Sequence, residues 1–295
     1  MFFRTDLALE LKEGGQAELA QVPCETIEKN RCKISRITIT NAIAETGTAP
    51  GEYVTIEMPP LSDALDENNE FLEVVSEELS RFIPQKGEVL VAGLGNVAIT
   101  PDALGEKVIE QILATRHVKE ELARITGVDE LRSVAAVSTD VLGNTGMETA
   151  EILQGLVQQL KPKAMIVIDA MAARNLDRLG RTIQLSNTGI APGAGVGNHR
   201  PRIDEVLLGV PVISVGVPTV VDAATVAVDL LGGQELSDEE KEKIREMVSP
   251  NGAAMFVTPR EVDLLIQRGA RMIGMAINVS LNPCFAVEDF ELLTK

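Results

Sequence analysis

The chain has 295 residues, of which 45% are hydrophobic and 24% charged, so it can bury a sizeable core and is not disordered throughout. Aromatic residues make up only 3% and the formal net charge is −17, which disfavours nucleic-acid binding by base stacking or by attraction to phosphate. Three cysteines without a CxxC pair, no secretory signal and no apolar run of membrane-spanning length predict a soluble cytoplasmic protein that contacts no membrane.

Residues 1–33 are polar and show little periodicity, and we interpret them as a loosely attached N-terminal arm. Residues 34–295 are expected to form a single α/β domain, since no linker rich in proline and glycine divides them. Two segments, 36–40 and 53–58, alternate apolar and polar residues and predict half-buried strands. Residues 67–83 carry apolar side chains at helical spacing and predict a helix with one buried face.

Four short apolar runs follow, and each predicts a strand that is buried on both faces, as in a parallel sheet. They are residues 89–92, 134–137, 164–168 and 210–215. Helical segments lie between them, at about 102–116, 147–160 and 219–231. Strands that alternate with helices predict a three-layer α/β fold, with a mostly parallel sheet and helices on both faces.

Capping signals predict two further helices near the end of the chain. Ser237 and Glu240 form a capping box at the start of an acidic helix. Thr258, followed by Pro259, predicts the start of another helix that runs to about residue 276.

The first candidate site is the loop after the run at 89–92, which contains Gly93, Gly95 and Asn96. Loops at the carboxyl ends of parallel strands form the site in an open α/β sheet, and glycines let the backbone approach a ligand closely. Asp102 is the ionisable residue of this loop. A tight turn without a ligand, and a carboxylate that only caps the following helix, explain the same pattern.

Asp169 directly follows the apolar run at 164–168. A carboxylate at the end of a buried strand is costly unless it is paired, hydrated or useful, so a functional role is favoured over a turn cap. Because both loops open on the same edge of a parallel sheet, Asp102 and Asp169 are expected to face one crevice.

Two more loops are candidate substrate-binding elements. Asn144 and Thr145 lie in a turn before a predicted helix, where simple helix capping explains the pattern equally well. Gly193 and Gly195 lie in a glycine-rich loop that can run along an extended peptide or bind an anion through its amides. His199 follows this loop and favours binding over a flexible surface loop.

Four long blocks of sequence resemble the germination protease family of spore-forming bacteria. They are GLGNVAITPDALG, GNTGMETAEIL, IVIDAMAARNLDRLGRTIQLSNTGIAPGAGVGN and GVPVISVGVPTVVDA. The N-terminal RTDLALE also fits, so the resemblance spans nearly the whole chain. It implies a phosphorylase/hydrolase-like α/β catalytic domain. It further implies an endopeptidase of the forespore cytoplasm that degrades small acid-soluble spore proteins during germination, as a homo-oligomer, a tetramer.

The resemblance also implies roles for individual residues. Asp102 and Asp169 match the proposed catalytic pair, in which one carboxylate deprotonates a water and its protonated partner donates a proton. The family is made as a zymogen that shortens itself, and the matching bond lies between Asp6 and Leu7, which makes residues 1–6 a short pro-segment. Neither a metal nor another cofactor is expected.

Two alternatives to this function remain open. The family is distantly similar to hydrogenase maturation endopeptidases, in which the matching carboxylates bind nickel. A nickel-dependent enzyme of that kind needs a third ligand, for which His199 is the candidate. The other alternative is a non-catalytic module that binds an anion or a nucleotide with the loops at Gly93 and Gly193.

Overall fold

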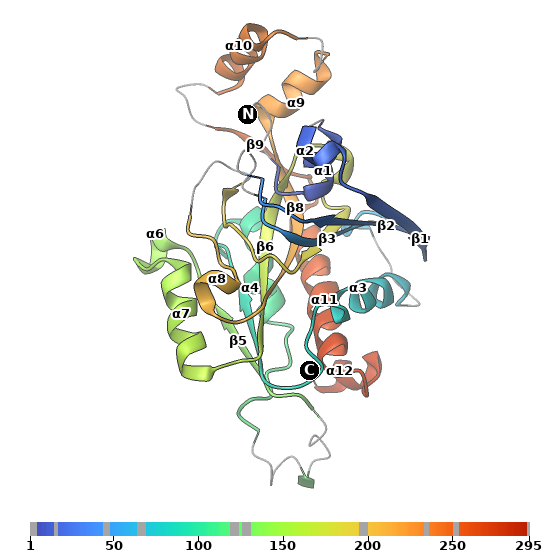
Figure 1. Ribbon diagram of the computed structural model, residues 1–295, viewed down its shortest axis with the longest axis vertical. Coiled ribbons are helices and arrows are strands. Elements are labelled where there is room, and N and C mark those ends of the chain that lie inside the picture. The colour runs from blue at the N-terminus through green and yellow to red at the C-terminus, as the bar shows by residue number, and fades with distance from the viewer. Residues whose placement is uncertain are drawn as a thin grey trace.

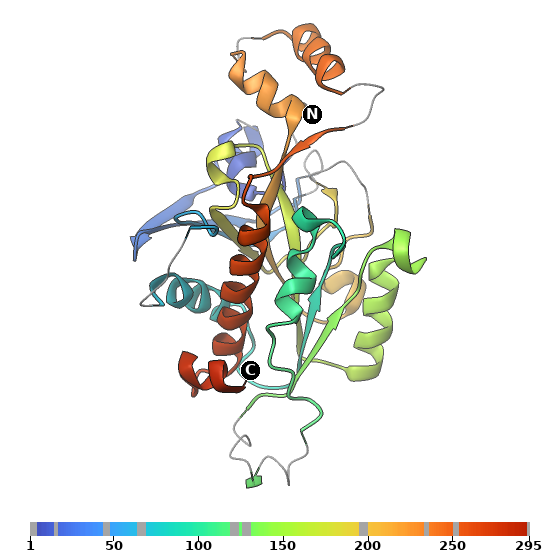
Figure 2. The same cartoon turned by 180° about the vertical axis from the view of Figure 1, so that it is seen from behind.

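The computed structural model describes residues 5–14, 17–43, 48–63, 69–118, 124–125, 131–194, 200–232, 236–249 and 254–293. These residues form a sheet of nine strands in the order β1-β2-β3-β7-β8-β6-β4-β5, with β9 paired to β8 outside this row. Helices cover both faces of the sheet, as Figure 1 and Figure 2 show from opposite sides. The three-layer α/β fold that the sequence predicts is therefore confirmed.

Four strands of the sheet run parallel to one another. They are β5 (Val134–Ser138), β4 (Val89–Gly93), β6 (Ala164–Ala173) and β8 (Val212–Asp222), paired in that order. Three of these strands contain an apolar run in full, and β8 begins two residues into the run at 210–215, because a strand covered by helices on both faces carries apolar side chains throughout.

The other half of the sheet is antiparallel and extends from β8. It consists of β7 (Thr182–Ser186), β3 (Gly51–Glu57), β2 (Cys32–Ile39) and β1 (Cys24–Lys29), paired in that order. The short β9 (Phe256–Val257) pairs with the end of β8. The two alternating segments of the sequence are β2 and β3, and the sheet as a whole is mixed.

Three helices, α3 (Glu70–Ser80), α4 (Leu104–Ile109) and α11 (Val262–Leu281), pack on one face of the sheet. Two others, α7 (Thr149–Leu160) and α8 (Glu205–Leu208), pack on the opposite face. The remaining helical elements are α1 (Ala8–Glu13), α2 (Ala17–Ala20), η1 (Thr100–Asp102), α6 (Leu142–Thr145), η2 (Leu176–Arg178), α9 (Ala223–Leu230), α10 (Asp238–Val248) and α12 (Val287–Leu293). Within the described ranges, no helix is long and apolar enough to cross a membrane.

Two helix starts differ from the prediction. β8 continues to Asp222, whose side chain accepts a hydrogen bond from the Thr225 N–H, so α9 begins after this residue instead of at about 219. The Thr258 hydroxyl donates to the Thr219 carbonyl (2.9 Å) and does not cap α11, which begins later in the chain. The capping box at Ser237 is confirmed.

The described part of the N-terminal segment is packed against the sheet. Leu7 is fully buried, and β1 with the start of β2 extends the sheet itself. Arg178 forms ion pairs with Glu10, Glu13 and Glu57, which attach α1 to the sheet. The interpretation as a loosely attached arm is therefore wrong for these residues, and a domain boundary at residue 33 stays a prediction.

Candidate active site

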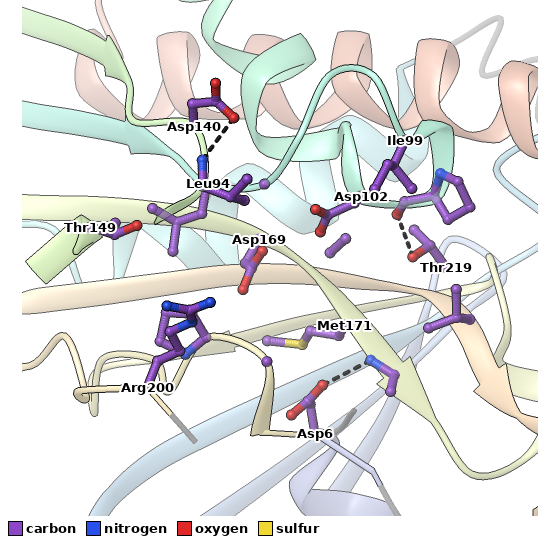
Figure 3. A pocket seen from close by; sticks show the side chains of 18 of the residues that line it. Asp6, Leu94, Ile99, Asp102, Asp140, Thr149, Asp169, Met171, Arg200 and Thr219 are labelled. Atoms are coloured by element: carbon purple, nitrogen blue, oxygen red, sulfur yellow. Dashed lines mark hydrogen bonds between the residues drawn. The ribbon is translucent and has the colours of Figure 1, made fainter. Parts of the chain in front are cut away.

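A cavity of about 450 Å³ lies at the carboxyl ends of β4, β5 and β6, beside the N-terminal segment (Figure 3). Four aspartates of the described chain line it: Asp6 before α1, Asp102 in η1, Asp140 after β5 and Asp169 in β6. Much of the remaining wall is apolar and includes Leu94, Ile99, Val141, Met171 and Phe256. The cavity occupies the edge of the sheet at which the sequence predicts the site.

Asp169 reaches this cavity because β6 is longer than β4. β4 pairs with β6 only as far as Gly93 and Ile168, and β6 then continues beside β8 to Ala173. Asp169 is the first residue of β6 beyond that end. Its side chain points into the cavity although the residue is only 7% exposed.

The surroundings of Asp169 favour its protonated form. Burial raises the pKa of Asp169 well above its ordinary value, and the negative charges of Asp102 and Asp6 raise it further. The N–H of Ala170 acts in the opposite direction and lowers the pKa. A protonated carboxyl at this place is a hydrogen-bond donor and a source of a proton.

Asp102 is held in place by the glycine loop after β4. Gly95 has a φ of +108°, and a Cβ atom there would lie 1.9 Å from the Asp102 carbonyl oxygen, so only glycine lets the loop close. The Asn96 N–H donates to Oδ2 of Asp102 at 3.0 Å. Burial raises the pKa of Asp102, the Asn96 N–H lowers it, and the charge of Asp140 raises it.

The pKa values of both carboxyl groups are raised, and that of Asp169 is raised more strongly. Asp169 is buried and its pKa is raised well above the ordinary value, whereas Asp102 is partly exposed and accepts a hydrogen bond that favours its ionised form. General acid–base hydrolysis needs one protonated and one ionised group in the same cavity. The arrangement is chemically able to activate a water with Asp102 and to supply a proton from Asp169.

The residue before the predicted processing bond lies on the wall of the same cavity. The Asp6 N–H donates to the Ala172 carbonyl (2.9 Å), and the Ala172 N–H donates to Oδ2 of Asp6 (2.8 Å; Figure 3). In the described part of the chain no strand pairs with this edge of β6 beyond Ile168, so its backbone groups are available to Asp6.

Some of the predicted loop residues line the cavity and others do not. Gly95 and Gly193 line the cavity. Gly93 faces the start of α4, where a Cβ atom would lie 2.2 Å from the Gly105 carbonyl oxygen. Asn96 does not line the cavity but binds Asp102 through its backbone.

Asn144 and Thr145 form hydrogen bonds within their own turn. Asn144 Nδ2 donates to Oδ1 of Asp140 (2.9 Å), and the Thr145 hydroxyl donates to the Val141 carbonyl (3.2 Å). The turn thereby holds Asp140, which has a φ of +56° and lines the cavity. Asp140 is not among the predicted site residues, although its place soon after the run at 134–137 is a usable signal.

Arg200 is the basic side chain of the cavity wall among the described residues, and its Nη1 donates to Oε1 of Glu148 (3.0 Å). Gly195 and His199 lie outside the described residues, so the nickel alternative that uses His199 stays a prediction. Where the chain is described, no group of three His, Cys, Asp or Glu side chains is placed to hold a metal ion.

Comparison with known proteins identifies the family. The profile of the germination protease family matches residues 5–233. The germination protease of Caldanaerobacter subterraneus subsp. tengcongensis is 44% identical over 306 residues, which cover 95% of this chain and 94% of that protein. The germination protease of Clostridium tetani is 40% identical, with 98% of each chain covered. A solved NiFe hydrogenase maturation protease HycI from Thermococcus kodakarensis is 16% identical, with a TM-score of 0.39 over 69% of this chain and 98% of its own. The matches to sequence relatives and to the family profile cover most of the chain, which therefore belongs to the germination protease family.

Proposed function

We propose that this chain is an endopeptidase that starts the breakdown of small acid-soluble spore proteins during germination, and that Asp102 and Asp169 perform the hydrolysis. Its family makes it a peptidase of spore germination. One observation carries the proposed mechanism: the two carboxyl groups share one cavity, and burial raises the pKa of both.

In the proposed mechanism, ionised Asp102 takes a proton from a water molecule whose oxygen attacks the carbonyl carbon of the substrate bond. Protonated Asp169 donates its proton to the carbonyl oxygen or to the leaving amine. The apolar wall of the cavity keeps the surroundings of Asp169 poorly solvated, which maintains its raised pKa and its proton. No cofactor enters this reaction.

We further propose that the chain is a zymogen that hydrolyses its own bond between Asp6 and Leu7. The position of Asp6 supports this proposal, because the residue before the bond lies on the wall of the cavity that holds both carboxyl groups. Residues 1–6 are then the pro-segment, and residues 34–295 are the catalytic domain.

The proposal extends to substrate contacts, assembly and location. Substrate is expected to meet the loops that contain Gly93, Gly95, Asn96, Asn144, Thr145, Gly193, Gly195 and His199. The enzyme is proposed to act in the forespore cytoplasm as a homo-oligomer, a tetramer, without binding DNA. The net charge of −17 supports the absence of DNA binding, which retention on DNA at physiological salt would contradict. Light scattering that reports a monomer would contradict the assembly.

The activity is tested by incubating the shortened protein with a small acid-soluble spore protein and identifying the fragments by mass spectrometry. Cleavage after an acidic and before an apolar residue is expected, as at the Asp6–Leu7 bond. Absence of fragments beyond those formed in buffer would refute the proposed activity. Stoichiometric nickel in the active protein would favour the metal-dependent alternative.

The processing is tested separately by the intact mass of the chain after mildly acidic incubation. Loss of residues 1–6 is the expected result. A chain that becomes active while it keeps its full length would refute the proposed zymogen without refuting the peptidase.

A further inference from the structure

The side-chain amide of Gln184 contacts the backbone on both sides of Leu7. Gln184 Nε2 donates to the Asp6 carbonyl oxygen at 2.9 Å, and the Ala8 N–H donates to Gln184 Oε1 at 2.7 Å. The Asp6 carbonyl is the one that hydrolysis of the Asp6–Leu7 bond would attack. Gln184 therefore binds the oxygen of that carbonyl, and it also binds the chain that would leave as the amine.

The orientation of this amide is determined by its partners. The Ala8 backbone N–H can only donate, so the atom that faces it is Oε1, and Nε2 must face Asp6. The backbone of Gln184 is held from both sides, since β7 pairs it with Thr55 of β3 and with Gly216 of β8. With the residue only 3% exposed, its amide has little water to compete for either hydrogen bond.

Asp6 is common to two cavities, one with the two carboxyl groups and one with Gln184. It lines the large cavity together with Asp102 and Asp169, and it also lines a smaller cavity of about 90 Å³ that includes Gln184. Water activated by a carboxyl group would approach the carbonyl from the larger cavity. The amide of Gln184 donates to the carbonyl oxygen and lines the smaller cavity, not the larger one.

We propose that Gln184 is a catalytic residue of the self-cleavage, and this rests on the processing proposed above. A carboxylate takes one proton from water, and the water oxygen forms a bond to the carbonyl carbon of Asp6. The π electron pair of that carbonyl moves onto its oxygen, whose negative charge is stabilised by Gln184 Nε2–H. The pair then re-forms the carbonyl as the bond to the Leu7 nitrogen breaks and the protonated carboxyl supplies a proton. The products are a new carboxyl group on Asp6 and a new amine on Leu7.

A purely structural role for Gln184 is the competing explanation, since the same two hydrogen bonds fix the start of α1. Gln184→Glu separates the two roles because it keeps the size of the side chain and an oxygen for the Ala8 N–H. It removes the donor to Asp6 at neutral pH, and it restores a donor when the introduced carboxyl is protonated at low pH. A structural role does not predict such a recovery.

The experiment follows the loss of residues 1–6 from the full chain by intact mass at several pH values. The variants are wild type, Gln184→Glu and the matched control Gln154→Glu, which changes a glutamine of α7 that donates to the Leu207 carbonyl. Gln184→Glu is expected to cleave itself 10²–10³-fold more slowly near neutral pH, the usual effect of losing one oxyanion donor. The difference in rate between wild type and Gln184→Glu is expected to become smaller as the pH falls. Gln154→Glu is expected to cleave itself at the wild-type rate at every pH.

Two results would overturn the proposal. One is a wild-type rate for Gln184→Glu, and the other is a slowing that does not change with pH and accompanies a lower unfolding temperature. If Gln184→Glu does not fold, Gln184→Asn keeps the amide but is one methylene too short to reach both partners, and a wild-type rate for it overturns the proposal as well. A wild-type chain that digests spore proteins but never cuts at Asp6–Leu7 would refute both the proposed processing and the role of Gln184 in it. The proposed peptidase activity would not be affected by that result.

Discussion

Replacing Asp169 by asparagine should remove hydrolysis while preserving the fold. The substitution keeps the size of the side chain but takes away the group that titrates, and with it the proton proposed for the leaving amine. A positioned acid or base contributes about 10²–10⁴-fold to a rate, so the loss should be at least 10²-fold. This range corresponds to about 3–5 kcal/mol in the activation free energy.

The same substitution should change stability in a pH-dependent way. In the folded chain, burial and the charges of Asp102 and Asp6 raise the pKa of Asp169 well above its ordinary value. Such a group stabilises the fold fully below its unfolded pKa, and this contribution is lost as the pH rises through the folded pKa. Asparagine stays neutral at every pH. At pH values above the folded pKa of Asp169, Asp169→Asn should therefore unfold at a higher temperature than wild type. At pH values below the unfolded pKa of Asp169, it should have no such advantage.

The assay pairs mass spectrometry of peptide fragments with thermal unfolding over the same pH range. Asp177→Asn is the control, because Asp177 is exposed in η2 and does not line the cavity. Near-normal cleavage by correctly folded Asp169→Asn would remove Asp169 from the mechanism. A lower unfolding temperature for this variant at high pH would show that the carboxylate is well compensated, against the argument from burial.

Two further changes test the surroundings of the site, and a third tests an ion pair between β2 and α3. Gly95→Ala adds a Cβ atom 1.9 Å from the Asp102 carbonyl oxygen at a positive φ, so the loop must move and kcat should fall at least tenfold. An unchanged kcat would show that this movement of the loop does not disturb Asp102. Asp140→Asn removes a charge that raises the pKa of Asp102, so the acidic limb of the pH–rate profile should move to lower pH; an unmoved limb would contradict the coupling. Burial raises the pKa of Glu78, but its bonds to Arg36 and Arg81 outweigh this and lower the pKa overall. Replacing Arg36 by alanine should therefore lower the free energy of unfolding in urea by up to about 3 kcal/mol at pH values above the unfolded pKa of Glu78. This loss should become smaller as the pH falls through the folded pKa of Glu78. An equal loss at all pH values would exclude the ion pair as the cause.

The strands that carry the site can be predicted from sequence because burial on both faces leaves continuous apolar runs. Asp102 and Asp169 can be singled out for a related reason, since a carboxylate beside such a run needs a compensating role. β7 escapes prediction because its buried side chains include Thr182, Gln184 and Ser186. Their polar character looks like that of an exposed segment, and only the folded neighbours show that each is enclosed.

The place of the N-terminal segment cannot be predicted in the same way. Asp6 is bound by the backbone of Ala172, which is 166 residues away in the chain, and backbone groups carry no sequence signature. The position of Asp140 depends on a φ of +56°, a conformation that is uncommon for a residue other than glycine and has no signature in the sequence. Both features follow from contacts between distant parts of the chain.

The unequal lengths of β4 and β6 explain why these features meet in one cavity. β4 ends at Gly93, where α4 approaches so closely that a side chain would collide with the Gly105 carbonyl. β6 continues past this point, and no strand of the described chain pairs with that edge, so Asp169 is nearly buried and still lines the cavity. The backbone groups of Ala172 on the same edge bind the segment that carries the proposed cleavage bond. A strand as long as β6 in the place of β4 would pair with those groups, and it would leave neither a cavity for Asp169 nor an edge for Asp6.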